Sequence, residues 1–94
     1  MRRLAWGQSF RRAFKRRTRN NPSLQHQIVD ALERLAENPF DPSLKSHKLT
    51  GKLHGLWACW VQYDCRIIYA FEHDQQSREE IIVLVDVGTH DEVY

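Results

Sequence analysis

The chain has 94 residues, of which 41% are hydrophobic and 28% are charged, and its formal net charge is +2. This composition is typical of a globular domain with a small core, and it excludes a disordered chain and a two-domain enzyme with a separate cofactor domain. No run of about 18 apolar residues predicts a membrane span. The apolar run at residues 4–6 ends too early for a signal peptide. We therefore expect one domain over residues 1–94, in the cytoplasm.

The basic residues are concentrated at the N-terminus. Residues 1–19 hold 8 of the 14 lysines and arginines and no acid, whereas residues 71–94 hold one arginine and seven acids. A basic run is often only a solvated helix face. Because no acid interrupts this one, a polyanionic partner is the favoured interpretation.

The first third of the chain predicts a short strand and two helices. Residues 3–6 are an expected edge strand, and Ser9 is the expected N-cap of a first helix. Asn21 and Pro22 are typical of the start of a second helix, which is expected to end before Pro39. Apolar residues three or four positions apart give each helix one apolar face: Phe10, Ala13 and Phe14 in the first, and Leu24, Ile28, Ala31, Leu32 and Leu35 in the second.

The remainder predicts a loop and a sheet. Residues 38–55 contain prolines and glycines and are expected to form a loop, whereas residues 56–63, 65–71 and 80–87 are rich in aromatic and β-branched residues and are expected to be strands. A tight turn at Tyr63-Asp64 and a longer one at 73–79 favour antiparallel pairing. The predicted fold is α+β: an N-terminal short strand and a two-helix hairpin packed on a twisted antiparallel sheet of three to four strands.

Sequence patterns for cofactors and metals are absent. No nucleotide-binding loop, zincin motif or serine-hydrolase elbow occurs, and we expect no cofactor. Cys59 and Cys65 match no metal motif and follow no secretion signal, so two reduced thiols are expected, although a disulfide across the hairpin stays possible.

The polar residues that stand out are typical of metal-free RNA cleavage. Such cleavage needs a base for the 2′-hydroxyl proton, an acid for the leaving 5′-oxygen, and cations for the phosphate between them. Histidine titrates near neutral pH, arginine binds phosphate bidentately, and a tyrosine can stack on a base. The candidates are His47 and His54 with Lys45, Lys48 and Lys52 in the loop, Arg66 within a strand, and His90 and Tyr94 in the tail.

Ordinary structural roles compete with these interpretations. His54, beside Gly55, is more typical of a turn residue. Arg66 is equally expected to form an ion pair with Asp64, Asp86 or the terminal carboxylate. Aromatic residues on one hairpin are usually packed in the core or across strands rather than against bases: Trp57, Trp60 and Tyr63.

Three segments together resemble the RelE/ParE toxin superfamily, and its YafQ-type mRNA interferases most closely. They are residues 44–51 (LKSHKLTG), 63–69 (YDCRIIY) and 87–94 (VGTHDEVY). The resemblance implies a RelE-like fold and a type II toxin that cuts mRNA in the ribosomal decoding site, without a metal. It also implies a cognate antitoxin as partner.

The resemblance also implies roles for individual residues. His47 corresponds to a candidate base, Asp64 to an aspartate that assists it, and Arg66 to a phosphate ligand. His90 corresponds to the candidate acid and Tyr94 to the aromatic that positions the nucleotide. Basic residues are expected to contact mRNA or ribosomal RNA: Lys45, Lys48, Lys52 and His54 in the loop, and Arg11, Arg12, Lys15, Arg16 and Arg19 near the N-terminus.

The chain departs from its relatives at three points. Ala58 and Trp60 stand where YafQ has an acid and a histidine, and the arginine that RelE has near His90 is absent. Because the chain stops at Tyr94, no C-terminal helix is expected to close over the groove. Alternative functions are therefore a ParE-like gyrase inhibitor, a nucleic-acid-binding module, or a catalytically weak toxin that only binds its antitoxin.

Overall fold

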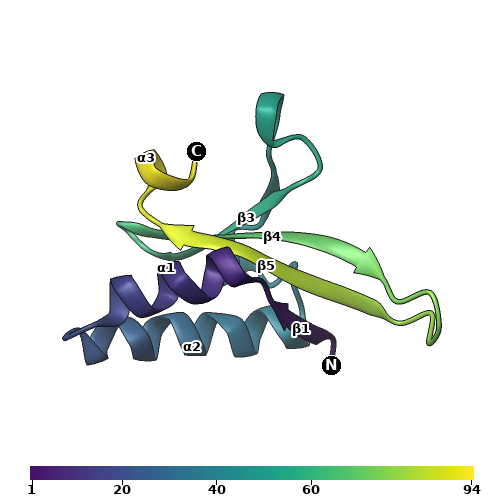
Figure 1. Ribbon diagram of the computed structural model, residues 1–94, viewed down its shortest axis with the longest axis horizontal. Helices are drawn as coiled ribbons and strands as arrows, with labels where there is room; N and C mark the ends of the chain where they lie inside the picture. Colours follow the sequence, from purple (N-terminus) through teal and green to yellow (C-terminus); the bar gives the residue numbers. More distant parts are fainter.

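A five-stranded sheet in the order β1-β5-β4-β3-β2 is the frame of the computed structural model, which describes residues 1–94 (Figure 1). The strands are β1 (Arg3–Trp6), β2 (His47–Lys48), β3 (Trp57–Gln62), β4 (Cys65–His73) and β5 (Glu80–Gly88). The helices are α1 (Gln8–Thr18), α2 (Pro22–Glu37) and α3 (His90–Val93), with 3-10 turns η1 (Pro42–Leu44) and η2 (Gly51–Leu53). The predicted α+β class and the helical hairpin are confirmed.

The sheet is mixed, which corrects the prediction of an antiparallel sheet of three to four strands. β1 pairs in parallel with β5, from Arg3 opposite Ile81 to Trp6 opposite Leu84. The helical hairpin is part of the long connection that parallel pairing requires. β2 lies within the predicted loop and pairs antiparallel with β3, and two residues are too few to show a strand pattern.

The first helix begins earlier than predicted, because Gly7 rather than Ser9 is its N-cap. The Gly7 amide donates a hydrogen bond to the Leu84 carbonyl over 3.1 Å. A Cβ at Gly7 would lie 2.7 Å from that same oxygen, so only glycine lets the chain turn this close to β5. The second helix begins as predicted, with the Asn21 side chain accepting a hydrogen bond from the Leu24 amide over 3.1 Å.

The main core lies between the helices and one face of the sheet (Figure 1). Phe10, Ile28 and Leu35 from the helices are fully buried against Ile67 and Leu84 from the strands. Side chains alternate along a strand, so residues 57, 59 and 61 of β3 face this core. Residues 58 and 60 face the opposite side, which we call the open face.

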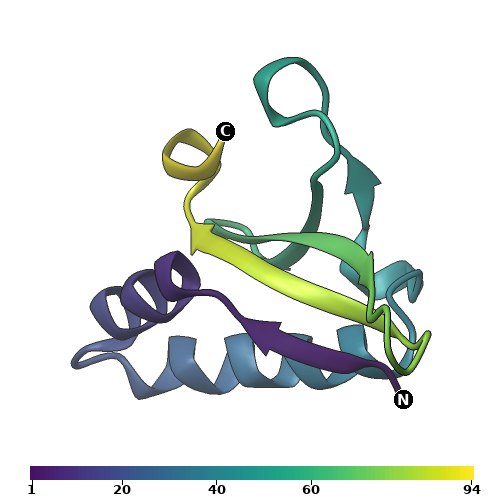
Figure 2. The same cartoon turned by 45° about the vertical axis from the view of Figure 1, so that its right-hand side comes forward.

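Two short segments rise over the open face, α3 and η2 (Figures 1 and 2). Beneath α3, Val93 packs with Ala58 and Ile68 in a second, smaller cluster. The expectation that no C-terminal helix covers this face is wrong, because residues 90–93 form one helical turn. The local cause is a capping box, in which Thr89 and Glu92 satisfy each other's backbone amides.

Both cysteines are free and buried on the core side, as predicted for reduced thiols. Cys59 lies opposite Ile67 in the strand register, not opposite Cys65. Burial raises the pKa of Cys59 to about 12 and that of Cys65 to about 11. None of the helices has the length and apolar character to cross a membrane.

Candidate functional site

Tyr94 brings the loop histidine and the tail histidine together on the open face. The Tyr94 hydroxyl lies 3.2 Å from His47 Nε2. The Tyr94 ring also meets the His90 ring edge-on, with 4.2 Å between the centroids. Three of the predicted site residues, one from β2 and two from α3 and its C-cap, therefore form one cluster.

The backbone fixes which nitrogen of His47 carries the proton. His47 Nδ1 lies 3.0 Å from the carbonyl oxygen of Lys45, which only accepts hydrogen bonds, so Nδ1 is the donor. In the neutral ring the free lone pair is then on Nε2, the atom that faces Tyr94. Lys45 has φ 49°, in the left-handed region that is uncommon for a residue with a Cβ. Its strained turn is what directs the carbonyl toward the ring two residues later.

Tyr94 is held as a neutral hydroxyl. Partial burial raises the pKa of Tyr94, while the positive charge of nearby Arg66 lowers it to a smaller extent. At neutral pH the hydroxyl therefore donates its proton to the lone pair of His47 Nε2. A 2′-hydroxyl of RNA would present the same donor to the same lone pair.

Arg66 faces the site without an acidic partner. Its Nη1 donates hydrogen bonds to the carbonyl oxygens of Gln62 (2.7 Å), Tyr63 (3.1 Å) and Cys65 (3.1 Å). None of the three expected ion pairs forms, because these carbonyls satisfy that end of the guanidinium. Arg66 lies opposite Trp60 in the strand register, and its Nε and Nη2 make no hydrogen bond, which leaves them free for an anion.

Asp64 is not part of this cluster. It lies in the exposed turn between β3 and β4, as predicted, and its side chain makes no hydrogen bond or ion pair. Tyr63 beside it is 91% exposed, so the expectation that it packs across the strands is wrong. Trp57 does pack as expected, against Phe40 and Phe71.

Trp60 is the site residue that the sequence interpretation assigned to the core. It is half-buried on the open face, and the Lys45 ammonium group lies over its ring, 5.1 Å from the centroid. The alternation along β3 places it there, since Cys59 and Val61 face the core. In the sequence, the alternation of side chains along the strand could have identified it, because Trp60 lies one position from Cys59 and one from Val61.

The loop lysines lie in two places, since Lys48 pairs with Trp57 in the strand register and its ammonium group lies over that ring, 5.7 Å from the centroid, away from the histidine cluster. Lys52 and Tyr94 line one hollow of about 350 Å³ with Leu49, Thr50 and Leu53. Lys48 and His54 line a neighbouring hollow of about 200 Å³, and His54 also ends η2, in agreement with the interpretation of it as a turn residue. On α1 and its C-cap, five basic side chains are exposed and have no acidic partner: Arg11, Arg12, Lys15, Arg16 and Arg19.

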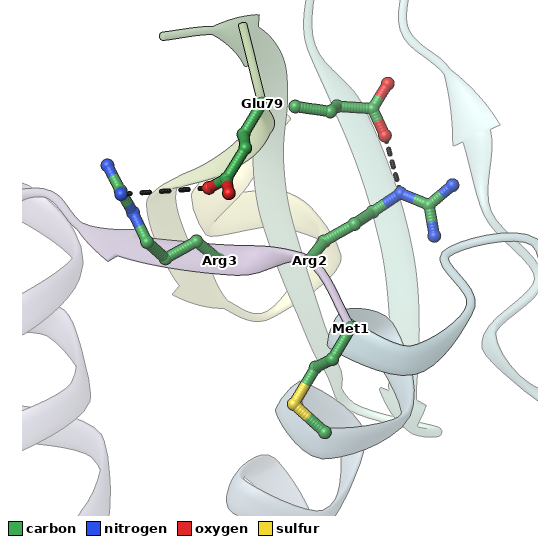
Figure 3. A pocket seen from close by; sticks show the side chains of 5 residues that line it. Met1, Arg2, Arg3 and Glu79 are labelled. Atoms are coloured by element: carbon green, nitrogen blue, oxygen red, sulfur yellow. Dashed lines mark hydrogen bonds and ion pairs between the residues drawn. The ribbon is translucent and has the colours of Figure 1, made fainter. Parts of the chain in front are cut away.

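The largest hollow, of about 730 Å³, lies elsewhere, at the start of β1 (Figure 3). Its charges are paired: Arg2 Nε lies 2.5 Å from Glu80 Oε1, and Arg3 Nη1 lies 3.9 Å from Glu79 Oε2. These pairs attach β1 to the β4–β5 hairpin. No histidine or cysteine lines this hollow, and no group of three potential metal ligands occurs in the chain. The histidine cluster thus lies away from the largest hollow, on the open face.

Solved structures share the whole of this fold. YafQ from E. coli strain BL21(DE3) superposes with a TM-score of 0.78 at 17% identity, over 100% of this chain and 99% of that one. The YoeB/ParE toxin from Agrobacterium tumefaciens has a TM-score of 0.77 at 18% identity, over 94% of this chain and 98% of that one. The E. coli DinJ-YafQ toxin-antitoxin complex matches with a TM-score of 0.75 at 17% identity, over 99% of this chain and 97% of that one.

The fold is that of the small RelE/ParE-like toxins. A family profile described as "Bacterial toxin of type II toxin-antitoxin system, YafQ" matches residues 2–94. The chain therefore belongs to the YafQ family of type II toxins. No curated protein sequence matches it significantly.

Proposed function

We propose that this toxin is a ribosome-dependent, metal-independent endoribonuclease that cuts mRNA in the decoding site. The observation that carries the proposal is the cluster of His47, Tyr94 and His90, in which one imidazole has its lone pair directed at a hydroxyl. A gyrase inhibitor or a docking module would need no such arrangement.

In the proposed reaction, His47 Nε2 accepts the proton of the ribose 2′-hydroxyl. The 2′-oxygen attacks the adjacent phosphorus, the bond from phosphorus to the 5′-oxygen breaks, and protonated His90 donates a proton to that oxygen. The products are a 2′,3′-cyclic phosphate and a 5′-hydroxyl end. The Nδ1 contact with the Lys45 carbonyl supports His47 as the base, because it orients the lone pair and stabilises the imidazolium that forms.

Arg66 supplies charge to the phosphate in this scheme. Its unused Nε and Nη2 are suited to the developing negative charge on the phosphate oxygens. Tyr94 would stack on a base once its hydroxyl gives way to the 2′-hydroxyl. Asp64 contacts neither histidine, so its orienting role requires the bound message.

Ribosomal RNA is the proposed docking partner of α1. Arg12, Lys15, Arg16 and Arg19 are exposed and unpaired, and a dense polyanion gains affinity from such residues without reading sequence. Lys45, Lys48, Lys52 and His54 would contact the message or nearby RNA. Sequence preference would then come from the codon that the ribosome presents.

An antitoxin is the second proposed partner. Solved relatives include the DinJ-YafQ complex of E. coli and a YoeB-YefM complex from Staphylococcus aureus. By analogy, a cognate antitoxin would cover the basic face of α1 or the open face with an amphipathic segment.

The test uses purified protein added to ribosomes stalled on a defined message, with primer extension to locate the break. Wild type is expected to cut inside the decoding-site codon and not to cut naked RNA. His90→Ala is expected to lose about 10²–10⁴-fold in rate. The matched control is His26→Ala, an exposed histidine on α2, which should cut like wild type.

Other outcomes would contradict the proposal. A 5′-phosphate product would exclude attack by the 2′-hydroxyl, and cleavage of naked RNA would exclude dependence on the ribosome. If neither wild type nor His26→Ala cuts, a DNA supercoiling assay would distinguish a gyrase inhibitor from a catalytically weak toxin. In a weak toxin, Ala58 and Trp60 would explain the missing activity, because neither side chain can transfer a proton.

A further inference from the structure

The helix that carries His90 and ends at Tyr94 is too short to be stable by itself. α3 has four residues, and a single turn does not repay the cost of helix nucleation in water. His90 and Tyr94 are four positions apart, which puts them on one side of the turn, toward His47. Whatever holds the other side of α3 therefore sets the geometry of the cluster.

One anchor is apolar and one is ionic. Val93 is 8% exposed and packs on the open face against Ala58 and Ile68. Glu92 is bound by its carboxylate: its Oε1 accepts a hydrogen bond from the Thr89 amide over 2.9 Å and lies 2.6 Å from Arg17 Nη1. A single oxygen thus joins the cap of α3 to the end of α1.

Arg17 differs from every other basic residue of α1. Its side chain is 21% exposed, and it forms the helix's only ion pair. The hydrogen bonds with Thr89 and the charge of Arg17 lower the pKa of Glu92, so the carboxylate is charged at neutral pH. Glycine at position 88 leaves space for this carboxylate, because a Cβ there would lie 3.0 Å from Glu92 Oε1.

We propose that the ion pair between Arg17 and Glu92 positions α3 for the reaction, so that Arg17 acts on the site through the tail rather than by binding RNA. The inference deepens the proposed function and rests on it. A shift of α3 of about 1 Å would separate the Tyr94 hydroxyl from His47 and misplace His90, and displacements of this size cost up to about 10²-fold in rate.

Glu92→Gln is the decisive variant. The glutamine oxygen can still accept the Thr89 amide, because glutamine also completes a capping box, so only the charge toward Arg17 is lost. In the stalled-ribosome assay we expect kcat to fall about 10- to 100-fold while KM stays within about twofold. Arg17→Gln should give the same loss, and the double variant should be no worse than either single variant.

The matched control is Arg12→Gln, which removes one charge from the same helix without touching Glu92. It should raise KM and leave kcat unchanged, the reverse of the Glu92→Gln pattern. The inference is overturned if Glu92→Gln leaves kcat unchanged, if it changes KM as Arg12→Gln does, or if the losses of the two single variants multiply in the double variant.

A second measurement separates this inference from the proposed function. The Tyr94 amide donates to the His90 carbonyl over 3.0 Å, so its hydrogen exchange reports on α3 directly. We expect exchange at Tyr94 to accelerate at least about tenfold in Glu92→Gln and Arg17→Gln, and the NMR signal of His47 Nε2 to shift, with neither change in Arg12→Gln. If wild type cuts no RNA, these signals still show whether the ion pair holds the tail, and unchanged signals would overturn the inference.

Discussion

The Tyr94 hydroxyl and His47 Nε2 are 3.2 Å apart, although 47 positions separate the two residues in the chain. His47 lies on β2, at one edge of the sheet, and Tyr94 follows β5, three strands away. The contact exists because the chain that follows β5 turns back over the open face as α3 (Figure 2). The site is therefore assembled from the edge strand β2 and the segment that follows β5.

Tyr94 offers a test of what this contact does. Tyr94→Phe keeps the ring and removes the hydroxyl, and we expect single-turnover cleavage to change by less than about threefold, because the 2′-hydroxyl takes the place of the Tyr94 hydroxyl at His47 Nε2. Tyr94→Ala also removes the stacking surface, worth about 1–3 kcal/mol per base, and should lose at least a further tenfold. Equal losses in the two variants would assign the whole effect to the hydroxyl and contradict a stacking role.

A substitution at Trp60 is expected to increase the cleavage rate. The sequence resemblance places a histidine of the YafQ-type toxins at this position, which lies on the open face and opposite Arg66. Trp60→His is expected to raise the cleavage rate about tenfold or more, since a positioned acid or base contributes about 10²–10⁴-fold. The control is Trp60→Gln, which is polar but does not titrate. An equal gain from glutamine would show that bulk, not proton transfer, limits the natural protein.

The exposed basic residues of α1 and its C-cap should determine salt dependence rather than chemistry. Replacing Arg12, Arg16 and Arg19 by glutamine removes three unpaired charges. The slope of log affinity for ribosomes against log salt should become shallower by about 0.7–0.9 for each phosphate that these arginines no longer neutralise. Arg34→Gln, on α2 and already paired with Asp30 over 2.9 Å, should leave the slope unchanged. An unchanged slope in the triple variant would exclude α1 as the docking face.

The buried thiols predict a loss of stability in alkali. Cys59 and Cys65 have pKa values of about 12 and 11 in the folded protein, against 9.0 for an ordinary thiol. Because the unfolded state loses these protons first, the free energy of unfolding is unaffected below pH 9 and declines as pH rises from about 9 through 11 to 12. Denaturant unfolding from about pH 8 to 11 should show this decline, and a Cys59→Ala/Cys65→Ala variant should show a smaller one.

Thiol labelling at neutral pH gives a second reading of the same prediction. A thiol-reactive dye should label neither cysteine until the protein is unfolded, because the reactive thiolate is suppressed and both side chains are buried. Rapid labelling of the native protein would contradict the burial of these residues.

Gly7 should be sensitive to the smallest substitution. In Gly7→Ala the new methyl group would lie 2.7 Å from the Leu84 carbonyl oxygen, so β1 or α1 must shift. We expect a loss of about 1–3 kcal/mol in the free energy of unfolding, measured by chemical denaturation. The control is Gln8→Ala, at the exposed next position, which should change stability by less than about 0.5 kcal/mol.

The sequence by itself determined the local elements and the chemistry available to the site. The apolar periodicity and Asn21-Pro22 predicted the second helix, and the aromatic and β-branched runs predicted β3, β4 and β5, because these signals act between residues near in the chain. The segments around His47, Arg66 and His90 also predicted the family. Short elements such as β2 and α3 were missed, since two to four residues carry no periodic pattern.

Only the tertiary structure decided which of these groups meet. Strand order and register decide that β1 pairs in parallel with β5 and that Trp60 lies on the open face. They also decide that Arg66 lies beside backbone carbonyls and not beside a carboxylate. The contact of Tyr94 with His47 and the ion pair of Arg17 with Glu92, 75 positions apart, also depend on strand order and register. Local sequence sets a residue's backbone preference, but contacts across such distances follow from packing the whole chain against one sheet.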